Sequence, residues 1–210
     1  MNPSTNHFWH EKFKQNDYVY GTQANDFLTE YHHYLPKNGR ILSLGEGEGR
    51  NAVYLAELGY QVTALDAAQS GLDKVQRLAE SQNVEVKTIL TDLAHYEFEP
   101  NQWDGIISIF CHLPPTLRQQ VHQQIPLALK TNGVFLLEAY APKQLDFKTG
   151  GPSALEMLYT AADLATELAP LQFERLVELE RNIHEGQAHH GTSAVVQIVA
   201  RRLSQTIEKA

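Results

Sequence analysis

A turn built from glycines and glutamates is the part of this sequence best suited to chemistry. Gly45, Glu46, Gly47, Glu48 and Gly49 follow a short apolar run, and apolar residues then recur at the spacing of one helix face. Glycines let the backbone approach a ligand without a Cβ in the way, and the start of a helix offers free N–H donors. The turn therefore predicts a ligand-binding loop between a strand and a helix.

A carboxylate, Asp66, stands at the end of the next apolar run. The order strand, loop, helix and strand places Asp66 beside the glycine turn, because both strands of a βαβ unit end at the same edge of the sheet. Asp66 can accept two sugar hydroxyls in charge-assisted bonds, each worth about 1.5–3 kcal/mol. We therefore expect a ligand that contains a ribose.

Two classes of ligand fit this loop, and they differ in charge. A dinucleotide would bring its pyrophosphate to the helix start, which favours anions, but Glu46 and Glu48 would repel it. The ammonium and sulfonium groups of S-adenosylmethionine would instead be attracted. The glycines are spaced G-x-G-x-G, and the dinucleotide spacing G-x-G-x-x-A is met only by starting at Gly47 and accepting Ala52. An NAD(P)-dependent oxidoreductase is therefore the alternative interpretation.

The composition narrows the partners and the location. Seventeen Lys and Arg against 25 Asp and Glu give a formal net charge of −8, which makes nucleic acid and anionic membranes unfavourable partners. The single cysteine, Cys111, excludes a disulfide within the chain and a cysteine-based metal cluster. No run approaches the ~20 apolar residues of a membrane span, and no apolar signal region begins the chain. We expect a cytoplasmic protein, a monomer or a homodimer, that acts on a small molecule.

The order of the elements predicts an α/β fold in one domain, residues 1–210. Residues 1–36 would form an N-terminal helical or lid segment. Residues 37–210 would form a doubly wound, mostly parallel sheet with helices on both faces. Two long strand-like runs joined by HEGQAHHG predict an antiparallel hairpin at the end of this core.

Three aromatic residues, Trp9, Tyr18 and Tyr20, precede the first strand. They have apolar bodies and polar tips, which suit two different uses. In one, they pack an N-terminal helix on the core. In the other, they cover a bound ligand and exclude water. The sequence leaves both uses open.

Further polar residues follow the other predicted strands. Asp92, before Leu93, is either a turn residue or an acceptor for the amino group of adenine. His112 and Tyr140 follow the fourth and fifth strands, at the edge where ligands bind in a doubly wound sheet. His112 is the first catalytic candidate, because a neutral imidazole can accept a proton from a hydroxyl or thiol; alternatively it orders the turn by bonding a backbone carbonyl. Tyr140 is the second candidate and Cys111 the third, although a buried cysteine more often packs.

Four blocks of sequence occur in the order found in class I S-adenosylmethionine-dependent methyltransferases, which this chain resembles. They are ILSLGEGEGRNAVYLAELG, VTALD, TDL and WDGIISIFCHLP. The head YVYGTQANDFL and the GRNA at the helix start are similar to the small tellurite-resistance and thiopurine-type branch of bacterial enzymes. The resemblance implies a seven-stranded Rossmann-like sheet with its last strand antiparallel and S-adenosylmethionine lying across the strand ends.

The resemblance also implies roles for individual residues. The glycine loop would hold the methionine part of the cofactor, Asp66 the ribose, and Asp92 with Leu93 the adenine. The complete set of expected cofactor-binding residues is Gly45, Glu46, Gly47, Gly49, Asn51, Asp66, Ala67, Asp92, Leu93, Ile109, Tyr18 and Tyr20. The family often carries an acid at the position of Ser43, so Glu46 or Glu48 would have to replace it.

The expected chemistry is in-line displacement at the sulfonium carbon, which is already activated and needs no metal. The adjacent pairs His32-His33 and His189-His190 lack zinc-type spacing, and we expect them to be solvated. The methyl acceptor stays open: a thiol, a thiopurine-like heterocycle or a metalloid oxyanion each fits a small-molecule enzyme. A protein that holds the cofactor without turnover is a further alternative.

Overall fold

The computed structural model describes residues 3–186 and 189–204. The strands within these residues are β1 Arg40–Leu44, β2 Gln61–Asp66, β3 Lys87–Leu90, β4 Trp103–Ile109, β5 Leu129–Tyr140, β6 Gln172–Glu185 and β7 His189–Arg201. The helices are α1 Pro3–Phe13, α2 Asp26–Tyr31, α3 Arg50–Glu57, α4 Gln69–Ser81, α5 Pro115–Ala128, α6 Gln144–Phe147 and α7 Ala161–Glu167, with short 3₁₀ turns at His32–Tyr34 and Leu155–Met157. Of these helices, none combines the length and the apolar composition needed to cross a membrane.

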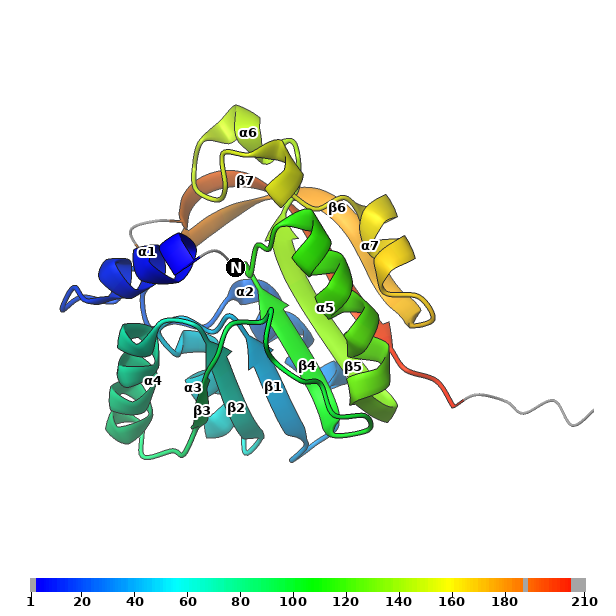
Figure 1. Ribbon diagram of the computed structural model, residues 1–210, viewed down its shortest axis with the longest axis horizontal. Helices are drawn as coiled ribbons and strands as arrows, with labels where there is room; N and C mark the ends of the chain where they lie inside the picture. The colour runs from blue at the N-terminus through cyan, green and yellow to red at the C-terminus, as the bar shows by residue number, and fades with distance from the viewer. Residues whose placement is uncertain (1–2, 187–188, 205–210) are drawn as a thin grey trace, which may run out of the picture.

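All the strands belong to a seven-stranded sheet with the order β3-β2-β1-β4-β5-β7-β6 (Figure 1). The pairs from β3 to β5 are parallel, and β7 runs antiparallel to both β5 and β6. This arrangement confirms the predicted fold class, including the antiparallel terminal hairpin. The ends of the predicted single domain, residues 1, 2 and 205–210, and the hairpin residues 187 and 188, lie outside the described residues.

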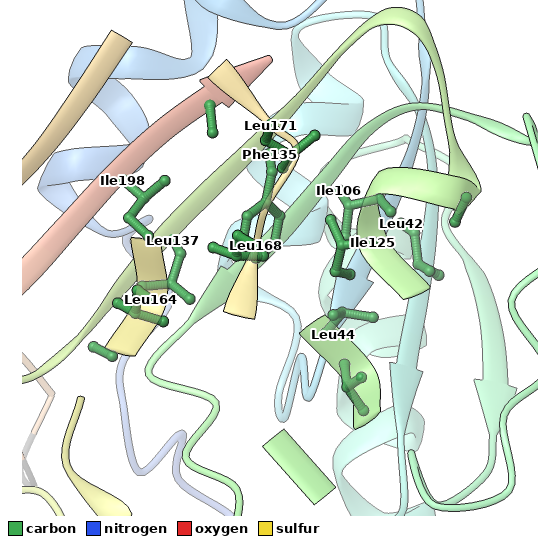
Figure 2. Packing of buried hydrophobic residues seen from close by; sticks show 14 of the residues in the cluster. Leu42, Leu44, Ile106, Ile125, Phe135, Leu137, Leu164, Leu168, Leu171 and Ile198 are labelled. Carbon is green, nitrogen blue, oxygen red and sulfur yellow. The ribbon is translucent and has the colours of Figure 1, made fainter. Parts of the chain in front are cut away.

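The core has two layers because successive strand residues point to opposite faces of the sheet. Leu42 and Leu44 of β1 face α5 and α7, where they join the cluster drawn in Figure 2. Ile41 faces the other side, where it packs with residues of α2, α3 and α4. Burial on both faces explains why the central strands read as nearly continuous apolar runs.

The β6–β7 hairpin bends toward the carboxyl edge of the parallel strands, near α1 (Figure 1). Its end lies against the segment before α2: a Cβ at Gly186 would stand 2.4 Å from the carbonyl carbon of Tyr20. Gly186 has φ +62°, a conformation that glycine adopts without the strain other residues meet. The close backbone approach therefore needs glycine at this position.

A buried network of charges fastens the hairpin to the rest of the fold. Arg181 Nη2 of β6 donates to Glu138 Oε2 of β5 at 2.6 Å, and Arg50 Nη2 of α3 donates to Glu185 Oε2 at 2.5 Å. The amide of Asn25 donates to Glu138 at 2.7 Å and to Glu185 at 2.8 Å. Each buried carboxylate thus faces a guanidinium, which offsets the cost of its desolvation.

Candidate active site

A cavity of about 720 Å³ lies at the carboxyl edge of the sheet. Its wall is formed by α1, the glycine loop between β1 and α3, the ends of β2, β4 and β5, and the first residue of β7. This size falls within the ~300–1,000 Å³ of typical small-molecule sites. A second hollow, of about 580 Å³, opens near Arg40 and Trp103 at the starts of β1 and β4, away from the glycine loop.

The glycine loop is compact because its glycines adopt left-handed backbone conformations. Gly45 has φ +58°, and a Cβ there would stand 2.6 Å from the Sγ of Cys111. Gly49 has φ +103°, and a Cβ there would stand 2.8 Å from the Cα of Val75 in α4. The loop therefore packs between the end of β4 and α4, and larger residues would push it away from both.

The two glutamates of the loop are already engaged, which corrects the charge argument made from the sequence. Glu46 accepts hydrogen bonds from the N–H groups of Asn51 (3.1 Å) and Ala52 (2.9 Å) at the start of α3, and from the hydroxyl of Ser43. Burial raises the pKa of Glu46, while these bonds oppose the rise. Glu48 forms a buried ion pair with Lys74 Nζ at 2.6 Å. The loop therefore offers less free negative charge than its sequence indicates.

Asp66 ties the loop to the end of β2. Its Oδ2 accepts from the N–H of Gly47 and its Oδ1 from the N–H of Ala68, both at 2.8 Å. Burial raises the pKa of the Asp66 carboxyl, and the backbone bonds oppose this rise. Each carboxylate oxygen can accept more than one bond, so Asp66 can hold the loop and still accept ribose hydroxyls.

The structure brings most of the predicted site residues into the wall of this one cavity. Those that line it are Gly45, Glu46, Gly47, Asn51, Asp66, Ala67, Leu93, Ile109, Tyr20, His112 and Tyr140. Three do not line it: Gly49, Asp92 and Tyr18. The carboxylate of Asp92 accepts from Ala94 N at 2.9 Å, while its neighbours Thr91 and Leu93 form part of the wall. Its proposed role at the adenine stays a prediction.

Tyr18 requires a correction, because it does not lie in the cavity wall. Its hydroxyl donates to the carbonyl of Lys74 in α4 at 3.2 Å, and its ring lies 5.3 Å from the Lys74 ammonium. Tyr18 therefore fixes the N-terminal segment to α4. Aromatic composition alone could not distinguish this packing role from contact with a ligand.

His112 is held at both ring nitrogens. Its Nδ1 lies 2.8 Å from the carbonyl oxygen of Met157, and its Nε2 accepts from the N–H of Tyr140 at 3.2 Å. Burial lowers the pKa of His112 to about 4. This geometry fits the interpretation that His112 orders the loops around the cavity, and protonation of Nε2 would break its bond to Tyr140. Two residues earlier, Phe110 has φ +52°, a strained conformation that often marks functional sites.

We expect His112 to make the folded protein less stable in acid. The pKa is about 4 in the folded state and near 6.5 in an unfolded chain. The unfolded state therefore takes up the proton first, so this contribution is complete above about pH 6.5 and is lost as the pH falls toward 4. In His112→Asn, the amide can donate to Met157 from the position of Nδ1, and it has no group that titrates in this range. The Tm should consequently fall less between about pH 7 and pH 5 in the variant than in the wild type.

Equal acid sensitivity in the two proteins would contradict this assignment. The interpretation of His112 as a catalytic base would be supported if His112→Asn kept its affinity for S-adenosylhomocysteine but its turnover fell by about 10²-fold or more. Both measurements use the same variant, so the positioning and catalytic interpretations can be separated.

Among the residues of the cavity wall that the sequence analysis did not propose are His189 and Arg50. His189 was expected to be solvated but is only 6% exposed, whereas His190 is exposed. Neighbouring strand residues point to opposite faces, so one of an adjacent pair in the hairpin had to face inward. Arg50, 7% exposed, follows the last glycine of the loop and reaches across to Glu185. In the sequence, Arg50 is a single arginine at the start of a helix. An arginine at such a position is equally compatible with exposure to solvent, so it did not indicate a buried ion pair.

The N-terminal segment forms one side of the cavity. Trp9 of α1 stacks on Phe13 with ring centroids 5.5 Å apart, and the backbone N–H of Tyr20 donates to Glu48 at 3.2 Å. Lys12 Nζ lies 4.9 Å from the Trp9 ring centroid and donates to the hydroxyl of Tyr20 at 2.8 Å. Trp9 and Tyr20 are therefore placed to cover a ligand, as one of the two sequence interpretations requires.

We expect residues 8–21 to become more ordered when a ligand fills the cavity. Four of their five aromatic side chains, those of Phe8, Trp9, Phe13 and Tyr20, line the cavity, whereas much of the surrounding segment is polar and exposed. Backbone hydrogen exchange in this segment should slow when S-adenosylhomocysteine is added, while exchange in α5, outside the N-terminal segment, should not change. Equal protection of residues 8–21 with and without the ligand would return these aromatics to a packing role.

Comparison with known proteins finds similarity to methyltransferases. Residues 41–133 match the family model of a methyltransferase domain. The probable S-adenosyl-L-methionine-dependent methyltransferase TehB of Haemophilus influenzae is 35% identical over 69 residues, which cover 33% of this chain and 24% of that protein. Phosphoethanolamine N-methyltransferase 2 of Caenorhabditis elegans is 34% identical over 104 residues, covering 48% of this chain and 23% of that protein. The matched stretches thus span about a quarter of these relatives.

Solved structures share the whole fold. The crystal structure of TehB from Haemophilus influenzae superposes with a TM-score of 0.68 at 20% identity, covering 94% of this chain and 66% of that one. A structure from work on "Conversion of a Disulfide Bond into a Thioacetal Group during Echinomycin Biosynthesis" gives 0.74 at 15% identity, covering 97% and 92% of the two chains. Residues 41–133 therefore match a methyltransferase domain, and the chain has the fold of S-adenosylmethionine-dependent methyltransferases, whose cofactor is S-adenosylmethionine. TehB is among the proteins to which it is similar in both sequence and fold.

Proposed function

We propose that this protein transfers the methyl group of S-adenosylmethionine to a small-molecule nucleophile. The observation that carries the proposal is the continuity of the cavity: the glycine loop and Asp66 line it together with His112 and Tyr140 at the ends of β4 and β5. A cofactor held by the loop and Asp66 would direct its sulfonium carbon toward the acceptor. Catalysis would then consist mainly of alignment and exclusion of water.

Several observations support a small acceptor. The net charge of −8 disfavours nucleic acid, and α1 and the hairpin leave a cavity of limited volume. The CHLPP segment after β4 differs from the Asn/Asp-Pro-Pro-Tyr pattern of methyltransferases that act on amino groups of nucleic acids or proteins. A relative named for phosphoethanolamine is consistent with small-molecule methylation. We keep a thiol, a heterocycle and a metalloid oxyanion as acceptor classes.

The side chains around the transfer site are poorly suited to remove a proton. Burial raises the pKa of the Cys111 thiol to about 12 and that of Tyr20 to about 12, and it lowers that of His112 to about 4. These groups are uncharged at pH 7. We therefore propose that the acceptor arrives as an anion or as a neutral nucleophile, or that its proton leaves to solvent.

A screen with methyl-labelled S-adenosylmethionine tests the proposal. Wild-type protein is incubated with small thiols, nitrogen heterocycles, and selenite or tellurite, and transfer of the label to the acceptor is measured. Labelled product with at least one small acceptor is the expected result. Binding of S-adenosylhomocysteine without transfer to any of these acceptors would instead favour a protein that holds the cofactor without turnover.

A further inference from the structure

Three buried polar side chains in the cavity wall each have an atom that lacks a hydrogen-bond partner. They are Arg50 Nη1, the hydroxyl of Tyr140 and His189 Nδ1, counted over the part of the chain that the structure describes. Arg50 is 7% exposed, Tyr140 0% and His189 6%. Buried polar atoms are nearly always paired, because an unmade bond costs the full desolvation of the group. Three such atoms in one wall indicate a missing partner.

The three side chains belong to one connected region. Arg50 Nη2 binds Glu185 Oε2 at 2.5 Å, and the same oxygen lies 3.9 Å from His189 Nδ1, beyond hydrogen-bonding distance. The His189 ring packs edge-on against Tyr140, with centroids 5.3 Å apart and planes at 87°. This region is therefore the hairpin end of the cavity, where α3, β5 and β7 meet.

The unused atoms define the chemistry of the missing partner. A guanidinium can only donate, and a tyrosine hydroxyl and an imidazole N–H can each donate as well. The charges already present are balanced, since Glu138 and Glu185 face Arg181 and Arg50. A ligand that offers acceptor oxygens and a negative charge would satisfy these donors and leave the existing ion pairs intact.

We propose that Arg50, Tyr140 and His189 form a subsite for a carboxylate. The inference rests on the proposed function, because either ligand of methyl transfer can supply this group. One source is the α-carboxylate of S-adenosylmethionine, and the other is a carboxylate carried by the methyl acceptor. The two sources make different predictions for binding.

Tyr140→Phe is the sharpest variant, because it removes only an unpaired hydroxyl. In the absence of ligand, its Tm should equal or exceed that of the wild type. Tyr159→Phe is the matched control: its hydroxyl donates to Cys111 O and accepts from Leu113 N, both at 2.9 Å, so its loss should lower the Tm. If Tyr140→Phe lowered the Tm as much as Tyr159→Phe, the Tyr140 hydroxyl would have a structural partner and the subsite would be overturned.

Calorimetry then separates the two sources, with Arg50→Lys as a second variant that keeps the positive charge beside Glu185. If the subsite holds the cofactor, both variants should bind S-adenosylhomocysteine about tenfold or more weakly. Their affinity for 5′-methylthioadenosine, which lacks the amino-acid part, should not change. If the subsite holds the acceptor, S-adenosylhomocysteine binding should be unchanged. In that case the wild-type complex with S-adenosylhomocysteine should bind 3-mercaptopropionate, which carries a carboxylate, more tightly than 2-mercaptoethanol. Both variants should lose this preference.

Wild-type affinities for all four probes in both variants would overturn the subsite and leave the proposed function standing. Failure of the wild-type protein to bind S-adenosylhomocysteine would overturn the proposed function and the subsite together. The binding measurements need no active acceptor, so they can be made before the substrate is known.

Discussion

Asp66→Ala should weaken binding of S-adenosylhomocysteine by about 2–3 kcal/mol, which is about 30- to 150-fold. The buried carboxylate would accept two ribose hydroxyls, and it already fixes the glycine loop through its bond to Gly47 N at 2.8 Å. Removing it would therefore cost both direct bonds and the position of the loop. Calorimetric titration of the two proteins measures the difference.

The control for Asp66 is another strand carboxylate that lies outside the cavity. Asp104 in β4 accepts from Lys130 Nζ at 2.9 Å and from Arg40 N at 2.9 Å. Asp104→Asn should leave the affinity for S-adenosylhomocysteine unchanged. If Asp66→Ala also bound with wild-type affinity, the assignment of the ribose to Asp66 would be wrong.

Lys74→Met should lower the free energy of unfolding by about 3–5 kcal/mol, because it leaves a buried carboxylate without its partner. The side chains of Lys74 and Glu48 are 1% and 2% exposed, and their charged atoms lie 2.6 Å apart. Lys74 also donates to the carbonyl of Asp17 at 2.7 Å. The pair thus joins α4, the glycine loop and the N-terminal segment. Denaturant unfolding of the wild type and the variant measures the loss.

Two further variants separate the ion pair from general effects of substitution. Lys130→Met breaks a pair with Asp104 whose side chains are 39% and 23% exposed, and it should cost less than about 1 kcal/mol. The double variant Lys74→Met with Glu48→Gln removes the unpaired charge and should recover part of the stability. If Lys74→Met and Lys130→Met lowered the free energy of unfolding by the same small amount, the buried pair of Lys74 and Glu48 would not be a major contribution to stability.

The sequence predicted those parts of the site that depend on local pattern. Arg40–Leu44 is recognisable as a strand because burial on both faces makes most of its residues apolar. The glycines of the loop that follows are recognisable because the backbone there takes positive φ values. Asp66 follows from the geometry of a βαβ unit, in which the two strands end at one edge. Each of these inferences uses neighbouring residues only, and the structure places them together as expected.

The rest depends on contacts between distant segments. Nothing near Glu48 in the sequence indicates that Lys74 neutralises it, and nothing near Arg50 indicates Glu185, which lies on the terminal hairpin. The buried position of His189 likewise depends on how the hairpin bends toward α1. Tyr18 and Tyr20 are two residues apart, yet only Tyr20 lines the cavity. Such choices are made by packing across the fold, which composition and spacing do not encode.

The most direct test of the account is a calorimetric titration of the wild-type protein with S-adenosylhomocysteine and, separately, with NADH. The glycine loop, Asp66 and the cavity at the carboxyl edge of the sheet predict saturable binding of S-adenosylhomocysteine at one site per chain, with competition by S-adenosylmethionine. They predict no comparable response to NADH. Tight binding of NADH without a response to S-adenosylhomocysteine would contradict the methyltransferase account.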